Sequence, residues 1–148
     1  MTDLLDVNVL VSLAWPNHVH HAAAHNWFGQ RRQRRWATTP VTESAFVRVS
    51  ANRSAIATAV SPAEALTMLA RIRDVPGRVF LPDDVELVVA EHVDPARVVT
   101  SHLVTDAHLL AVARRHEARL ATFDRGVAAM AGANAADVVL VSTSASRN

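Results

Sequence analysis

Residues 4–10 read LLDVNVL, an apolar run that one carboxylate interrupts. The residues up to Asp6 predict a buried strand over residues 3–6, and those after it predict a helix over residues 7–14, which Pro16 ends. A carboxylate between leucine and valine side chains has to be at least partly buried, and a buried charge needs a partner. This stretch therefore predicts a strand that ends at a functional acid and passes directly into a helix.

The alternation of strand and helix continues along the rest of the chain. Further strands are predicted at residues 36–38, 78–81, 119–123 and 138–141. Further helices are predicted at residues 20–28, 43–52 with Thr42 as its cap, 61–74, 105–116 and 126–130, with a short helix after Asp94, an ambiguous segment at 86–90 and a frayed tail at 142–148. Continuous apolar strands that alternate with helices are typical of a parallel sheet covered on both faces. We therefore expect one α/β domain over residues 1–148, with its core at about residues 3–141.

Composition excludes several classes of protein. The chain has 148 residues, half of them apolar, which is enough for one domain with a hydrophobic core. It has no cysteine, which excludes disulfides, zinc sites built on thiolates and cysteine nucleophiles. It has no apolar run that could cross a bilayer and no segment resembling a signal peptide, so we expect a cytoplasmic protein without a membrane partner. All 15 basic residues are arginine, and the net charge of +1 permits nucleic-acid binding without requiring it.

Four acidic residues occupy equivalent places in this pattern. Asp6 and Asp124 end predicted strands, and Glu43 and Asp106 lie in the first turns of predicted helices. Ligands of parallel sheets bind beyond the carboxyl ends of the strands, so all four are expected at one edge. Taken singly, a helix dipole explains an acid in a first turn, and Asp124 could open a turn before Gly126. Together the four carboxylates predict a site for a hard divalent cation.

Clustered carboxylates raise one another's pKa values, and a bound Mg²⁺ or Mn²⁺ removes that penalty. The same ion would activate water and neutralise charge during cleavage of a phosphodiester. Asn8, Thr105 and Thr122 are predicted to orient the carboxylates, although ordinary turn and cap chemistry explains these polar residues equally well.

Four segments together resemble the PIN domain, and more narrowly the VapC-type ribonuclease toxins of bacterial toxin–antitoxin pairs. The segments are LLDVNVL at 4–10, TESAFVR at 42–48, VTDAHLLAVA at 104–113 and LATFDRG at 120–126. The resemblance implies a PIN-like three-layer α/β/α sandwich with a mostly parallel central sheet. It implies that Asp6 and Asp106 are the principal Mg²⁺ ligands and that Asp124 completes the site. Glu43 would be a further ligand or would activate the attacking water.

The family pattern leaves the number of metal ions open. Relatives often carry an aromatic or polar residue three positions after the last acid, where this chain has Val127. The resemblance implies a Mg²⁺-dependent endoribonuclease, with Mn²⁺ as a substitute, that inhibits growth until a small antitoxin neutralises it. It also implies a homodimer and a toxin–antitoxin hetero-oligomer.

Two alternative functions stay open from the sequence. One is a catalytically inactive PIN-like module that binds RNA or protein. The other is a phosphatase of the haloacid dehalogenase type, whose first strand also ends in an aspartate. That class has a second aspartate two positions after the first, where this chain has Asn8, and it needs a catalytic lysine or arginine in a set place, whereas this chain has no lysine.

Arginine and histidine clusters complete the candidate residues. The candidate RNA contacts are Arg31, Arg32, Arg34 and Arg35, flanked by Trp27 and Trp36, together with Arg48 and Arg125. His18, His20, His21 and His25 form a cluster in which His21 and His25 have the spacing of a zinc pair. No third ligand is evident, so a solvated helix face is the favoured interpretation of the histidines.

Overall fold

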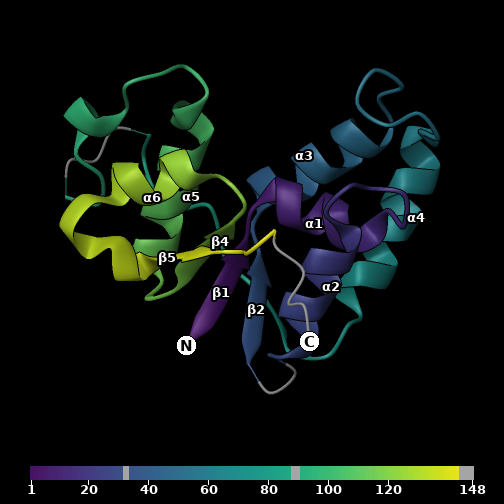
Figure 1. The fold of residues 1–148 in the computed structure, drawn as a ribbon, viewed down its shortest axis with the longest axis horizontal. Coiled ribbons are helices and arrows are strands. Elements are labelled where there is room, and N and C mark those ends of the chain that lie inside the picture. The colour runs from purple at the N-terminus through teal and green to yellow at the C-terminus, as the bar shows by residue number, and fades with distance from the viewer. Residues whose placement is uncertain (32–33, 88–90, 144–148) are drawn as a thin grey trace.

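Five strands form a single sheet in the order β3-β2-β1-β4-β5, and every pair is parallel (Figure 1). The computed structural model describes residues 1–31, 34–87 and 91–143. The strands are β1 (Thr2–Leu5), β2 (Arg35–Thr38), β3 (Arg78–Phe80), β4 (Arg119–Thr122) and β5 (Val138–Leu140). Candidate residue Arg32, part of the ambiguous segment 86–90 and most of the predicted tail lie outside the described residues.

Helices follow the strands along the chain. They are α1 (Val7–Ala14), α2 (His21–Gly29), α3 (Pro40–Ser50), α4 (Pro62–Arg73), α5 (Leu103–Arg115) and α6 (Arg125–Ala131), with 3₁₀ segments η1 (Pro95–Arg97) and η2 (Gly132–Asp137). In the part of the chain that is described, no helix is long and apolar enough to cross a membrane.

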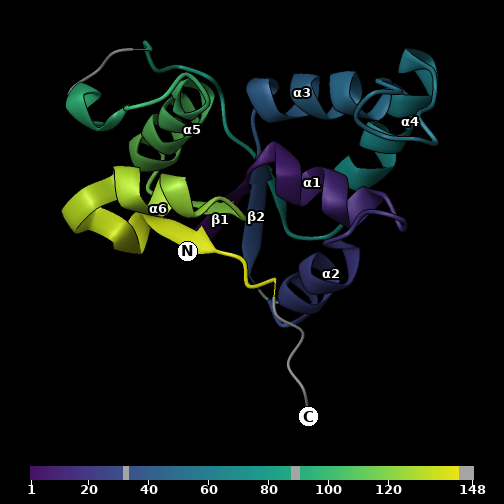
Figure 2. The ribbon, with the colours of Figure 1, turned by 45° about the horizontal axis from the view of Figure 1, so that its top comes forward.

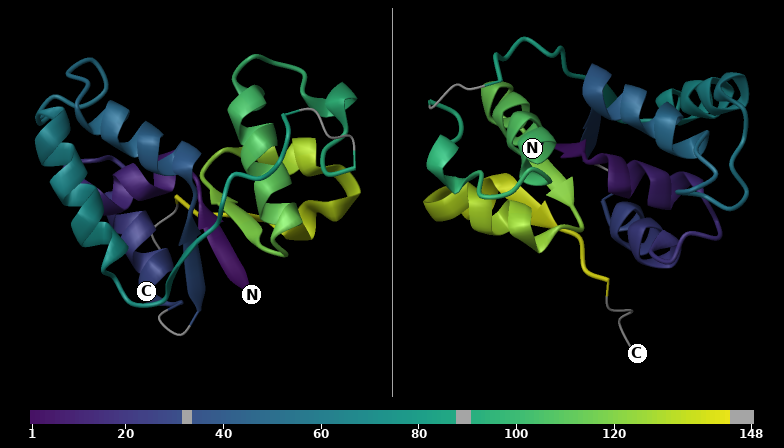
Figure 3. Two further views of the ribbon diagram at one scale, coloured as in Figure 1. Left: turned by 180° about the vertical axis from the view of Figure 1, so that it is seen from behind. Right: turned by 90° about the horizontal axis from the view of Figure 1, so that it is seen from above.

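The sheet separates two groups of helices. Helices α1 to α4 lie on one side of it and α5 and α6 on the other (Figures 2 and 3). Successive side chains of β1 point to opposite faces of the sheet. Leu4 packs in the core on the α5–α6 side, and Leu5 packs in the core on the α1–α4 side. Such alternation is the pleat of a strand buried on both faces. The predicted three-layer sandwich with a parallel sheet is therefore confirmed.

The predicted start of α3 is wrong by three residues. The helix begins at Pro40 rather than at Glu43, and Thr39 rather than Thr42 is the capping residue. Proline is tolerated in the first turn because its missing N–H has no partner there. Thr42 lies inside that turn, where its Oγ1 accepts a hydrogen bond from the Thr39 N–H at 3.1 Å. The other predicted boundaries of the observed helices and strands agree with the structure to within two residues.

Candidate active site

Asp6 is a buried carboxylate at the carboxyl end of β1. Its side chain is almost fully enclosed, and it caps α1 by accepting a 2.6 Å hydrogen bond from the Val7 N–H at Oδ1. Oδ2 accepts a 2.7 Å bond from the Thr122 hydroxyl. Burial raises the pKa of Asp6, and these two hydrogen bonds partly oppose that rise by stabilising the charged form. The predicted burial of this acid is confirmed.

The hydroxyl of Thr122 connects three polar groups of the site. Besides donating to Asp6, its Oγ1 accepts from the Asp124 N–H at 3.1 Å and faces the Asn8 Nδ2 at 3.4 Å. A threonine hydroxyl offers one donor and two acceptor positions, so all its capacity is used. The end of β4 and the starts of α1 and α6 are thereby fixed to one another.

Asp106 and Asp124 bring further negative charge to the same edge. Asp106 lies half-buried in the first turn of α5. Burial raises its pKa to about 7, and the charges of Asp6 and Asp124 add to the rise. Asp124 is exposed and caps α6 through a 2.7 Å bond from the Gly126 N–H to its Oδ1. Three of the four predicted acids therefore lie close enough to repel one another.

The amide oxygen of Asn8 is a buried acceptor beside these carboxylates. Among the described residues, nothing donates a hydrogen bond to its Oδ1. A buried acceptor without a partner costs free energy, and a cation or an ordered water would remove that cost. Carboxylate and amide oxygens are the hard donors that Mg²⁺ prefers.

The oxygen ligands at this edge fit a Mg²⁺ ion that keeps some of its water better than an ion coordinated by protein atoms alone. Over residues 1–31, 34–87 and 91–143, no three histidine, cysteine or acidic side chains are arranged to hold a metal ion together. Mg²⁺ usually keeps several waters and is bound through one or two carboxylates and the substrate phosphate. Two of the three acids would therefore be enough to hold it.

Glu43 lies in a different environment from the other three acids. Its Oε1 accepts a 2.8 Å bond from Arg78 Nη2 and a 2.7 Å bond from the Thr38 hydroxyl. Arg78 also donates to Thr38 Oγ1 from Nε and Nη2, at 3.2 and 3.0 Å. Glu43 is not among the charges that raise the pKa values of the buried acids. Arg78 is not predictable from the local sequence, because the register that brings it to Glu43 depends on the pairing of β2 with β3.

The arginine cluster lies at the opposite edge of the sheet. Arg35 opens β2, and Arg31 pairs at 3.0 Å with buried Asp3 at the start of β1 while covering the ring of Trp27. A four-residue strand spans about 10 Å, so these side chains start about that far from the acid edge. Arg31, Arg34 and Arg35 therefore start at the edge opposite the acids, and their contact with RNA stays a prediction.

The remaining candidate residues lie near the acids but are not bonded to them. Arg48 is exposed on α3 and lines, with Glu43, a groove of about 660 Å³ between α3 and α4. Arg125 is exposed at the first position of α6, directly after Asp124. Thr105 is exposed on α5, so the prediction that it orients a carboxylate gains no contact in support.

The histidine cluster has a structural role at the end of α1. Rings of His21 and His25 bond at 2.8 Å to the carbonyl oxygens of Ser12 and Leu13, which lie in the last turn of α1. Such carbonyls lack partners within their own helix. Both rings therefore cap α1. His25 is exposed, as expected of a solvated helix face, whereas His21 is half-buried.

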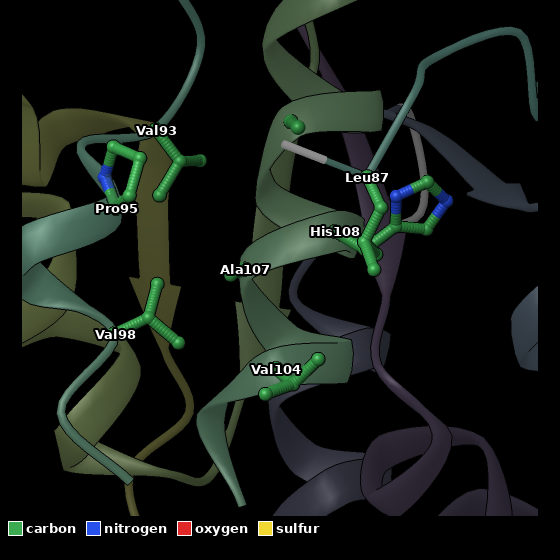
Figure 4. A pocket seen from close by; sticks show the side chains of 8 residues that line it. Leu87, Val93, Pro95, Val98, Val104, Ala107 and His108 are labelled. Atoms are coloured by element: carbon green, nitrogen blue, oxygen red, sulfur yellow. The ribbon is translucent and has the colours of Figure 1, made fainter. Parts of the chain in front are cut away.

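A separate apolar pocket lies on another face of α5. Its volume is about 160 Å³, and His108 projects from α5 next to Leu87 at its rim (Figure 4). The Nε2 of His108 bonds to Asp83 at 2.7 Å. Apart from His108 the pocket has an apolar lining, so it does not offer the acid chemistry found at the carboxyl edge.

Comparison with known proteins agrees with this geometry. The PIN domain family matches residues 4–133. Ribonuclease VapC39 of Mycobacterium tuberculosis (strain ATCC 25618 / H37Rv) is 49% identical over 139 residues, which are 94% of this chain and 100% of that protein. Ribonuclease VapC38 of the same strain is 48% identical over 128 residues, 86% of this chain and 89% of that protein. The chain belongs to the PIN-domain family, among the VapC-type ribonucleases.

Proposed function

We propose that the protein is a Mg²⁺-dependent endoribonuclease that hydrolyses RNA phosphodiester bonds as the toxin of a toxin–antitoxin pair. The observation that carries this proposal is the mutual repulsion of Asp6, Asp106 and Asp124 at the carboxyl edge of a parallel sheet. Repulsion among the carboxylates destabilises the folded protein without a cation, whereas with a bound cation the same carboxylates form a site that can activate water. The names of the relatives, which are ribonucleases, support the choice of RNA as substrate.

Some of the acids would bind the metal ion, and Glu43 would either join them or orient the attacking water. When bound, Mg²⁺ or Mn²⁺ supplies an acidified water and neutralises charge on the phosphoryl group. Asp6 and Asp106 would be its principal ligands, and Asp124 would hold it directly or through a water. Thr122 keeps Asp6 Oδ2 in one orientation through the 2.7 Å bond, and Asn8 offers its free Oδ1 from the same side.

Glu43 would orient the attacking water or serve as a further ligand. Arg78 and Thr38 both donate to Oε1, which fixes the carboxylate plane. Within the described residues nothing donates to Oε2, so this oxygen is available to accept a proton or a hydrogen bond from water. Arg48, exposed in the groove that Glu43 also lines, and Arg125, exposed directly after Asp124, would contact the RNA backbone.

The proposed partners follow from the family. We expect a small cognate antitoxin that covers the acids, a homodimer and a toxin–antitoxin hetero-oligomer in the cytoplasm. Size determination of the protein alone and with a co-expressed antitoxin would test these assemblies.

Induced expression in bacteria tests the proposed activity in cells. Wild type should stop growth and fragment cellular RNA within the induction period, whereas Asp106→Asn, produced at the same level, should do neither. Normal growth with intact RNA on induction of wild type would reject the toxin proposal.

A further inference from the structure

A groove adjoins the candidate active site on the α6 side of the sheet. Residues 96–103 form one wall and α6 the other, and the volume between them is about 540 Å³. Sites for small organic ligands have volumes of roughly 300–1,000 Å³. The groove is therefore large enough to enclose a ligand of nucleotide size.

Asp124 belongs to both the groove and the acid cluster. It lines the groove, and its negative charge also raises the pKa values of Asp6 and Asp106. The Gly126 N–H, which binds Oδ1 at 2.7 Å, keeps the Asp124 side chain in this position. An occupant of the groove would consequently lie directly next to a phosphate held at the acids.

Apolar side chains form part of the walls. Val99 is 75% exposed at the rim, while Leu103 and Met130 present largely buried side chains deeper in the groove. Flat faces of nucleobases pack on apolar surfaces, and methionine sulfur makes favourable contacts with aromatic rings. This lining suits a base better than it suits a phosphate.

Arg97 supplies a cation at the same groove. Its guanidinium lies against Gly132, where an added Cβ would come within 2.7 Å of Arg97 Cζ. Its ion pair with Asp94 is long, at 3.8 Å, and both side chains are half-exposed, so little energy holds the guanidinium to that partner. Arg97 is therefore free to pair with a phosphate, which a guanidinium binds in a bidentate manner.

Two further polar groups stand beside Arg97. Thr100 and His102 line the groove from the segment that leads into α5, and both are exposed. They offer a hydroxyl and an imidazole, which can bond to base edges or to ribose. A groove that combines apolar walls, a guanidinium and donors beside an acid cluster matches a nucleotide more closely than an apolar protein segment.

We infer that this groove, which we call the Arg97 groove, binds one nucleotide of the RNA substrate next to the scissile phosphate. The base packs against Val99, Leu103 and Met130, and Arg97 pairs with the neighbouring phosphate. This inference rests on the proposed ribonuclease function and adds a site that selects the nucleotide beside the cut.

Binding by an inactive protein tests the groove without turnover. In an Asp6→Asn background, fluorescein-labelled single-stranded RNA of random sequence is titrated and fluorescence anisotropy is measured. Loss of a phosphate contact and base packing through Arg97→Ala with Val99→Ala should weaken binding about tenfold or more. Arg71→Ala is the matched control, because it removes the same charge from exposed α4 on the other side of the sheet, and it should weaken binding less than about twofold.

Cleavage mapping tests the selection of a nucleotide. Wild type and the single variants Arg97→Ala, His102→Ala and Val99→Ala are given a random RNA pool, and the cut ends are sequenced. Wild type should show a base preference within one or two nucleotides of the cut, and the groove variants should flatten it while still cleaving. All three positions are exposed, so the variants are expected to fold.

Two results would overturn the inference. One is an RNA affinity of the Arg97→Ala, Val99→Ala protein equal to that of Arg71→Ala. The other is an unchanged base preference in every groove variant, which would indicate that the groove binds a protein partner instead of RNA. Absence of cleavage by wild type would instead reject the proposed function. The binding comparison in the inactive protein would still show whether the Arg97 groove binds RNA.

Discussion

Thr122 Oγ1 donates a 2.7 Å hydrogen bond to Asp6 Oδ2, although the two residues stand 116 positions apart in the sequence. The bond joins the end of β4 to the start of α1 and satisfies an oxygen of a buried carboxylate. It therefore ties the stability of the fold to the geometry of the acid cluster.

Replacing Thr122 by valine should destabilise the protein. The isosteric change keeps the packing but leaves Asp6 Oδ2 without its donor, at a cost of about 1–3 kcal/mol. Urea unfolding of wild type and Thr122→Val measures the difference. Thr67→Val, at an exposed position of α4, is the control and should change stability by less than about 0.5 kcal/mol. Equal midpoints for Thr122→Val and wild type would show that the bond does not stabilise the fold.

Asp106 should make the stability of the metal-free protein depend on pH. Its folded pKa of about 7 lies above the unfolded value of about 3.9, so the folded state binds the proton more tightly. The corresponding stabilisation is complete below about pH 4 and is lost as pH rises through 7.

The comparison with Asp106→Asn isolates this effect from His18, whose lowered pKa acts in the opposite direction. In EDTA, the stability of wild type relative to Asp106→Asn should fall by about 1 kcal/mol from pH 5 to pH 8, after allowance for solvent screening of the half-buried carboxyl. This is a relative shift of about 3 °C in Tm. Parallel melting temperatures for the two proteins across this range would contradict the assignment.

Divalent metal should stabilise the protein through the acid cluster. At pH 8, Mg²⁺ or Mn²⁺ at one hundred times its Kd should add about 2.7 kcal/mol. Thermal melts with and without the ion measure this gain, which Asp6→Asn should largely abolish and Asp74→Asn, at the exposed end of α4, should retain. If Asp6→Asn gains as much as wild type, the ion binds elsewhere.

Arg78 and Glu43 should be energetically coupled. Each single substitution to alanine leaves a largely buried charge without its partner, at a cost of about 2–4 kcal/mol. The double variant removes both charges, so it should be more stable than the sum of the single effects predicts, by about 1–3 kcal/mol. Additive effects in a double-mutant cycle would mean that the 2.8 Å pair contributes no interaction energy.

The sequence was sufficient to predict the sheet and the convergence of three acids. Apolar runs that end at Asp6 and Asp124 fixed the carboxyl edge, because parallel strands end at a common edge. The fourth acid differs: Glu43 was placed correctly on α3, but its partner comes from β3, and no local pattern reveals a contact that depends on strand register.

The place of Arg31, Arg34 and Arg35 also follows from the sequence order. They precede or open β2, so they lie at its amino end, away from the acids. The capping of α1 by His21 and His25 could not be predicted from the sequence. It depends on how α2 folds back against the end of α1, which is a tertiary contact.

Cleavage of RNA by purified protein tests the central claim most directly. Wild type with Mg²⁺ should cleave, and EDTA should abolish the activity. Asp6→Asn should be at least about 100-fold slower, because several kcal/mol of transition-state stabilisation depend on the held ion. Equal rates for Asp6→Asn and wild type, or undiminished cleavage in EDTA, would contradict a metal-dependent nuclease site at these acids.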